Sequence, residues 1–131
     1  MSIRSDLITQ ITSNLSGQSN ISISEELPFD SGGTPLYEKN MNVIYVDEQD
    51  IVVEQLYRTL DQSNVNTSST NVTAYMAVDA KNQFANINTV VANILLARNT
   101  ISNTITSESD YETDIEDDVI TYTFEYNFTT I

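Results

Sequence analysis

The sequence predicts an α+β fold in which two helices pack on one face of an antiparallel-rich sheet. Three observations lead to this prediction. Apolar residues recur at helical spacing near the N-terminus and again after residue 82, short β-type runs lie between these segments, and a strictly alternating segment follows the second helix. The predicted order is α-β-β-β-β-α-β, and strands grouped between helices are typical of α+β folds. The length of 131 residues predicts one domain, residues 1–131.

The first predicted helix covers residues 3–16. Ser2 is suited to cap its start and Gly17 to end it, and the apolar stripe consists of Ile3, Leu7, Ile8, Ile11 and Leu15. Alternating isoleucine and serine at residues 21–24 then predict a short strand. Pro28 interrupts this pattern, and residues 28–42, which include FDSGGTP, are predicted to form a long ordered loop.

The middle of the chain is predicted to supply three strands. The first covers residues 43–47, and a turn at residues 48–50 leads into a second β-type run at residues 51–60. Leu56 and Leu60 also permit a short helix there. The polar stretch 61–71, DQSNVNTSSTN, is predicted to be an exposed hairpin loop. Residues 72–79, VTAYMAVD, are predicted to form the next strand.

The last third of the chain predicts a long helix and a long strand. Helical spacing runs over residues 82–103, which corresponds to about 33 Å of helix. Residues 119–129 alternate strictly, with one apolar face made by Ile120, Tyr122, Phe124, Tyr126 and Phe128. Such a strand spans about 36 Å. One helix is therefore long enough to cover one strand.

Composition excludes several kinds of chemistry. The chain has neither cysteine nor histidine, so disulfides, thiolate metal sites and Ser-His-Asp or Cys-His catalysis are excluded within it. We therefore expect no enzyme and no cofactor. The formal net charge of −14 disfavours sequence-specific nucleic-acid binding, which needs clustered lysine and arginine. We expect no membrane span, because no run of about 20 apolar residues occurs.

Seven carboxylates crowd residues 108–118 and raise the question of a metal site. A calcium-binding EF-hand loop beginning at Asp110 would need glycine at its sixth position and glutamate at its twelfth, where this chain has Ile115 and Thr121. The acids from Asp110 to Glu116 alternate with other residues, so an extended segment would present them on one wet face. The segment is predicted to be an acidic face or a turn into the final strand. A cation site of another kind remains an alternative.

Several stretches taken together resemble the tail terminator, or tail completion, proteins of long-tailed bacteriophages. They are MSIRSDLITQIT, LPFDSGGTPLYEKN, VTAYMAVDAKN, INTVVANILLAR and DYETDIEDDVITYTFEYNF. The resemblance implies a small α+β structural subunit of the virion tail and neck, made in the host cytoplasm. Such subunits form a homo-oligomeric ring, a hexamer, that caps the tail tube and ends its polymerisation. The ring then contacts the neck or head-completion proteins and, in contractile tails, the sheath.

The resemblance carries no residue-specific motif, so it assigns no catalytic or metal-binding residue. We expect the long loops to make contacts; the expected contact residues are Phe29, Asp30, Tyr37, Lys39, Ser63, Asn64 and Ser68. The expected acidic surface consists of Asp110, Glu112, Asp114, Glu116, Asp117 and Asp118, and genome DNA would pass through the ring without adhering to it. Alternatives are another neck or tail subunit (a head-tail connector, sheath stabiliser or tube protein) and an acidic cation-binding module.

Overall fold

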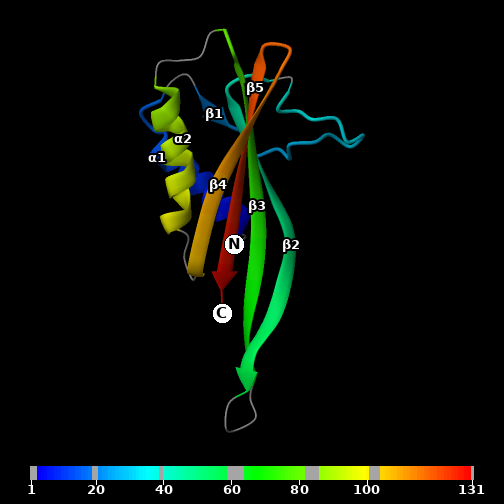
Figure 1. Ribbon diagram of the computed structural model, residues 1–131, viewed down its shortest axis with the longest axis vertical. Coiled ribbons are helices and arrows are strands. Elements are labelled where there is room, and N and C mark those ends of the chain that lie inside the picture. The colour runs from blue at the N-terminus through cyan, green and yellow to red at the C-terminus, as the bar shows by residue number, and fades with distance from the viewer. Residues whose placement is uncertain are drawn as a thin grey trace.

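The computed structural model describes the backbone at residues 3–18, 21–38, 40–58, 64–81, 86–100 and 104–130. Side chains are described at residues 3–18, 21–38, 40–48, 69–81, 86–98 and 108–129. Figure 1 shows the helices lying beside a long, twisted sheet. The helices are α1 (Ile3–Asn14) and α2 (Ile87–Leu96), with a 3-10 turn, η1 (Ala97–Thr100). The strands are β1 (Ser22–Ile23), β2 (Val43–Arg58), β3 (Asn64–Asp79), β4 (Thr104–Glu116) and β5 (Val119–Thr130).

The five strands form one sheet in the order β1-β2-β3-β5-β4. Only the short β1 is parallel to its neighbour, and the other three pairings are antiparallel. The predicted α+β class, with an antiparallel-rich sheet and two helices on one face, is confirmed. The detailed order differs, because three strands precede α2 and two follow it.

Both helices cover the same face of the sheet and enclose one hydrophobic core. Each central strand contributes alternate residues to this core, as a half-buried strand must. The residues are Ile44 and Val46 from β2; Val72, Ala74, Met76 and Val78 from β3; and Ile120, Tyr122, Phe124, Tyr126 and Phe128 from β5. The apolar stripe predicted for the last strand is therefore the core face of β5.

Arg4 ties the first helix to the sheet. Its Nε donates to the carbonyl of Val46 at 2.7 Å, and its Nη2 donates to the carbonyl of Glu25 at 2.6 Å. The helix begins at Ile3 as predicted, with Leu7 and Ile11 fully buried, but it ends at Asn14, two residues early, and Gly17 does not have the predicted left-handed conformation. One cation thus donates to backbone carbonyls of the sheet and of the segment after β1.

Two predictions for the middle of the chain are wrong. Residues 48–50 do not separate two strands, because β2 runs through them with a register shift between Glu48 and Ile51. Residues 64–71 are not a loop but the first half of β3, paired with β2 from Asn64 onward. The polar sequence there hid the strand, because hydrogen bonding to a neighbour overrides weak local β-propensity.

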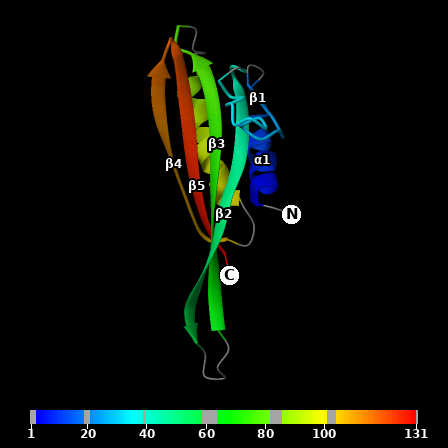
Figure 2. The same cartoon turned by 90° about the vertical axis from the view of Figure 1, so that its right-hand side faces the viewer.

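The hairpin of β2 and β3 extends beyond the rest of the sheet as a two-stranded arm. Among the described residues, the pairing of β5 with β3 reaches Ser68, and residues 64–67 of β3 pair with β2 alone. Figures 1 and 2 show this arm leaving the body at the end opposite the β4–β5 turn. We define the arm as residues 54–58 and 64–67.

The second helix is shorter than predicted, and the acidic segment is a strand. The helix α2 ends at Leu96 and tightens into η1, where asparagine and threonine are weak helix formers. Residues 82–85 and 101–103 of the predicted helix lie outside the described residues. The stretch 108–116 belongs to β4, which pairs along β5, and the predicted turn lies at Asp117 and Asp118.

Candidate functional site

The acids of β4 form a row on the face of the sheet that the helices leave uncovered. The register places Asp110 opposite Glu125, Glu112 opposite Thr123 and Asp114 opposite Thr121. Residues directly opposite each other share a face. The neighbouring β4 residues lie opposite the core residues of β5, so the acids point away from the core. Glu108, Asp110, Glu112, Asp114 and Glu116, all exposed, are called the acidic row below.

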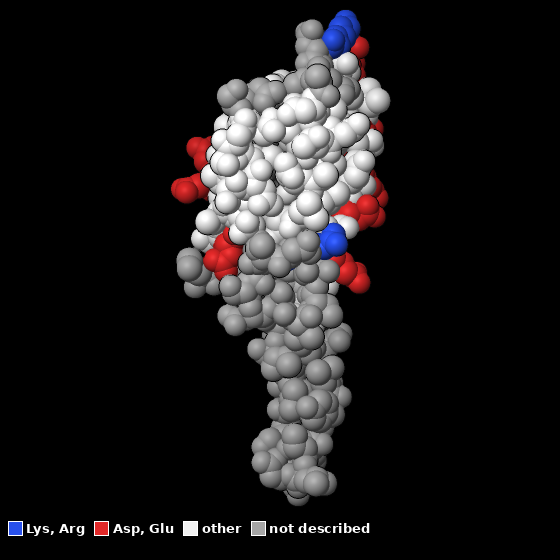
Figure 3. Space-filling view, turned by 90° about the vertical axis from the view of Figure 1, so that its left-hand side faces the viewer, with Lys and Arg blue, Asp and Glu red and all other residues white. Residues whose placement is uncertain are grey.

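The helix-bearing side has the opposite character. Figure 3 shows that the centre of this side carries little charge and that acids gather along its margins. The predicted acidic surface therefore does not extend over the centre of the helix-bearing side. Four of its six predicted members, from Asp110 to Glu116, share one face of one strand.

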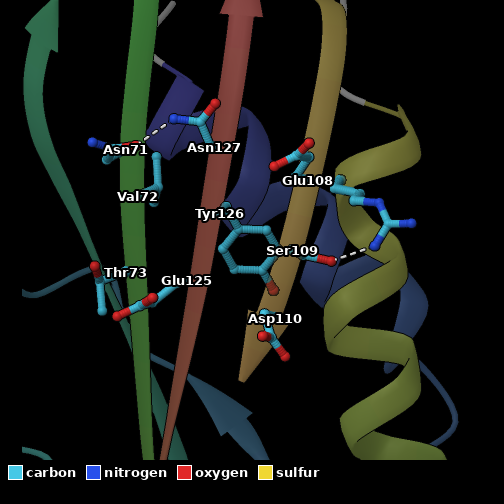
Figure 4. A pocket seen from close by; sticks show the side chains of 10 residues that line it. Asn71, Val72, Thr73, Glu108, Ser109, Asp110, Glu125, Tyr126 and Asn127 are labelled. Atoms are coloured by element: carbon cyan, nitrogen blue, oxygen red, sulfur yellow. Dashed lines mark hydrogen bonds between the residues drawn. The ribbon is translucent and has the colours of Figure 1, made fainter. Parts of the chain in front are cut away.

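A broad hollow of about 720 Å³ lies against the acidic row. It is lined by Asn71, Val72, Thr73, Arg98, Glu108, Ser109, Asp110, Glu125, Tyr126 and Asn127 (Figure 4). Among the described residues, the cation that lines it is Arg98, whose guanidinium donates to the hydroxyl of Ser109. That hydroxyl donates in turn to the carbonyl of Leu95, which links β4 to the end of α2. The bond to Ser109 thereby holds Arg98 in place. The hollow remains acidic and open, because Glu108, Asp110 and Glu125 also line it.

A second hollow, of about 260 Å³, lies near the β4–β5 turn. Its lining includes Glu38 from the loop after β1, together with Asp114, Glu116 and Asp117. The acidic character of the row therefore continues to the end of the hairpin.

The two predicted acids at the turn have a structural role. Asp117 and Asp118 adopt left-handed backbone conformations, with φ of 51° and 64°, as a two-residue type I′ hairpin turn requires. The Asp118 carboxylate forms an exposed ion pair with Lys81 at 3.1 Å. Such pairs contribute about 0–1 kcal/mol.

Two of the predicted contact residues, Asp30 and Tyr37, hold their own loop together. Asp30 Oδ1 accepts from the backbone N–H groups of Gly32 and Thr34, both at 2.9 Å. Tyr37 stacks on Tyr75 of β3 with 4.5 Å between ring centroids. Phe29 packs edge-on against the same Tyr75 and is still partly exposed. The loop is thus fixed to the uncovered face beside the acidic row.

The remaining predicted contact residues are placed less fully. Lys39 and Ser63 lie outside the described residues. Asn64 and Ser68 lie in β3 and not in a loop; Asn64 is part of the arm. Whether any of these residues contacts a partner stays a prediction.

Burial shifts the pKa of several tyrosines in this molecule. Burial raises the pKa of Tyr126 strongly, and the nearby Arg98 lowers it only in part. Burial also raises the pKa of Tyr75, with further increases from Tyr37 and from the carboxylates Asp47 and Glu125. Each of these tyrosines stays protonated and neutral near pH 7. None is thereby activated as a base or nucleophile.

The acidic row is poorly arranged to enclose a metal ion. Alternate residues on a strand lie about 6.6 Å apart, whereas calcium needs six to eight oxygens at about 2.3–2.6 Å. Among the described residues, no group of three or more acids has metal-binding geometry. The cation-binding alternative therefore gains no support from the geometry.

Two features of β4 were not predicted from the sequence: the exposure of Tyr111 and Ile115, and the position of the strand at the edge of the sheet. Tyr111 and Ile115 lie on the helix side of this strand, yet they are 42% and 68% exposed, because α2 covers only the part of the strand near Ser109. The alternation of acids with Tyr111, Thr113 and Ile115 was visible in the sequence. The sequence did not indicate that this segment is the edge strand of the sheet.

None of the described helices has the length and apolar character needed to cross a membrane. No protein-family model matches the chain, and no curated protein is significantly similar to it in sequence. The function must therefore be argued from the geometry and from the resemblance noted above.

Proposed function

We propose that the protein is a structural subunit of a phage virion, a tail terminator that assembles into a hexameric ring. The ring would cap the tail tube, end its polymerisation and offer a face to the neck or head-completion proteins. The resemblance of the sequence to tail terminators motivates this proposal. The observation that supports it best is the β2–β3 arm.

The arm is suited to contacting another subunit and not to catalysis. A two-stranded hairpin alone is at best marginally stable in water, and it needs packing against other structure. Within the part of the chain that the structure describes, residues 64–67 of β3 pair only with β2, and the arm stands clear of both helices (Figure 2). Four residue pairs project about 13 Å. An adjacent subunit of a ring would supply the missing packing surface.

The acidic row suits a ring through which DNA passes. Six subunits at −14 each would carry about −84 before counterions. Carboxylates facing the channel would repel phosphates, and screening would limit the effect to about 8 Å at physiological salt. Reversing the charge of Glu112, Asp114 and Glu116 should slow genome passage. Unchanged ejection kinetics would mean that the row does not line the channel.

Oligomeric state is the decisive test. The purified protein is expected to form a closed six-fold ring by native mass spectrometry and electron microscopy. A variant that joins Glu54 to Thr67 through Asn-Gly would remove residues 55–66, and thus all of the arm except its first pair. It would keep the hairpin, because Glu54 and Thr67 are directly paired. It should fold, judged by circular dichroism, and remain monomeric.

A matched control changes the other end of the molecule. Replacing Asp117-Asp118 by Asn-Gly also alters a hairpin turn, and this variant should still form rings. Open tubes instead of rings would favour a tube protein, one of the alternatives. A monomer at all concentrations, with normal tails in a phage carrying the arm deletion, would refute the proposal.

The loop at residues 28–42 provides a second test. Its Gly/Ser-rich replacement should leave the subunit folded but block ring or tube assembly. Normal tail length and head joining would remove this loop from the contact surface. Calcium titration by calorimetry addresses the cation-binding alternative, which saturable micromolar binding would favour.

A further inference from the structure

The outer edge of β4 offers main-chain hydrogen-bonding groups. β4 is the last strand of the sheet, and along the described residues 110–116 its ladder partner is β5 alone. In a two-residue hairpin the residues that flank the turn, here Glu116 and Val119, form a hydrogen-bonded pair. Every second residue back from Glu116 therefore directs its N–H and C=O toward β5. The groups of Tyr111, Thr113 and Ile115 point outward.

One observed contact agrees with this assignment. The backbone N–H of Tyr111 donates to the carboxylate of Asp110 at 2.8 Å, so it is not used in the ladder. Toward the start of β4 the strand is covered, because Ser109 bonds to Leu95 and Arg98 at the end of α2. The accessible edge is therefore residues 110–116, a length within the usual range of about three to ten residues for a strand.

The two faces of this edge differ in chemistry. On the uncovered face lie Asp110, Glu112, Asp114 and Glu116 of the acidic row. On the helix side lie Tyr111 and Ile115, 42% and 68% exposed. Charges on an edge strand commonly prevent pairing between copies. A highly exposed isoleucine on the same edge does not serve that purpose, and it offers apolar area to a partner.

A second copy of this chain does not fit the edge. Pairing β4 with another β4 would set carboxylates against carboxylates, which is destabilising. β2, at the opposite side of the sheet, carries four acids and one arginine in its sequence. The five cations of the chain, Arg4, Lys39, Arg58, Lys81 and Arg98, are never two residues apart. No segment of this chain can therefore present alternating cations.

We infer that residues 110–116 of β4 bind an extended segment of a different protein, in which lysine or arginine alternates with apolar residues. The segment adds a sixth strand to the sheet. Its backbone pairs with the outward carbonyl of Tyr111 and with the outward groups of Thr113 and Ile115. Its cations face the acidic row, and its apolar side chains cover Tyr111 and Ile115. The inference depends on the subunit's edge and not on ring formation, but it competes with the channel-lining role proposed above, because the cations of a bound segment would cover the acidic row.

The test uses a fluorescent nine-residue peptide in which lysine and valine alternate, with blocked termini. A peptide of the same composition with its lysines and valines in separate blocks is the control for simple charge attraction. Fluorescence anisotropy should show that the alternating peptide binds the full-length protein at least about tenfold more tightly. On binding, the amides of Thr113 and Ile115 should become protected from hydrogen exchange. Equal binding of both peptides, or no added protection, would overturn the inference.

Two kinds of variant test separately the contribution of the backbone hydrogen bonds and that of the charges. Thr113→Pro removes one outward N–H without touching the ladder to β5 and should weaken binding about tenfold. Thr113→Val keeps that N–H and should bind like the wild type. Neutralising three acids together, by D110N, E112Q and D114N, should weaken binding and reduce its salt dependence. Wild-type binding by a folded Thr113→Pro variant would refute strand addition; if that variant does not fold, the exchange measurement decides.

Discussion

The hydroxyl of Tyr126 is the most informative single group to remove. This side chain is 2% exposed and donates to the carbonyl of Ile94 in α2 at 2.6 Å, joining the central strand to the covering helix. Tyr126→Phe deletes that bond and little else. The Ile94 carbonyl also accepts from the N–H of Ala97, so it keeps one partner in the variant. The cost should therefore be that of one hydrogen bond, about 1 kcal/mol, and not that of an unsatisfied buried carbonyl.

For a chain of this length, a loss of about 1 kcal/mol corresponds to a fall in Tm of about 3–4 °C. Urea unfolding at pH 7 measures the free energy directly. Tyr111→Phe is the matched control: Tyr111 is 42% exposed, so its change should be within about 0.5 kcal/mol. A loss above about 3 kcal/mol, or none, would contradict the geometry at Ile94.

The same variant has a signature at high pH. Burial raises the pKa of Tyr126 in the folded state above its ordinary value near 10. Above pH 10 the folded protein thus holds a proton that the unfolded chain releases, and stability falls as pH rises. Removing Tyr126 should reduce this slope by about 1.4 kcal/mol per pH unit. Equal slopes above pH 10 in both proteins would show that this tyrosine ionises normally.

Three further substitutions test separate contacts. Asp118→Gly should stabilise the fold by about 0.5–1 kcal/mol in thermal unfolding, because φ is 64° there and the lost pair with Lys81 is exposed; a loss of stability would count against the turn geometry. Glu125→Lys should add about 0.2–1 kcal/mol, more at low salt, by placing a cation opposite Asp110; a salt-independent change would mean that these residues do not interact. Arg4→Met should cost roughly 1.5 kcal/mol or more by urea unfolding, because it removes the bonds to Val46 and Glu25 while keeping the apolar stem; a neutral effect would dismiss Arg4 as the tie between α1 and the sheet.

Elements with clear periodicity were predictable from the sequence, and elements defined by their partners were not. The first helix and the apolar face from Ile120 to Phe128 follow from spacing alone. The strand character of residues 64–71 comes from pairing with β2, which no local pattern encodes. The alternation of the acids correctly predicted that they share one exposed face of a strand. Their position on an edge strand depends on the sheet order, in which β5 pairs with β3 and leaves β4 outside.

The sheet order also has a consequence for how the chain folds. The β2–β3 and β4–β5 pairs are each hairpins of neighbouring segments, which can form within microseconds. The β3–β5 ladder joins them and brings together residues about 50 positions apart, such as Val72 and Tyr126. Closing this long loop is entropically costly and slows folding. Docking of two preformed hairpins is thus expected to limit the folding rate. Substitutions that shorten side chains along the β3–β5 ladder should therefore slow folding more than changes at the Asp117–Asp118 turn.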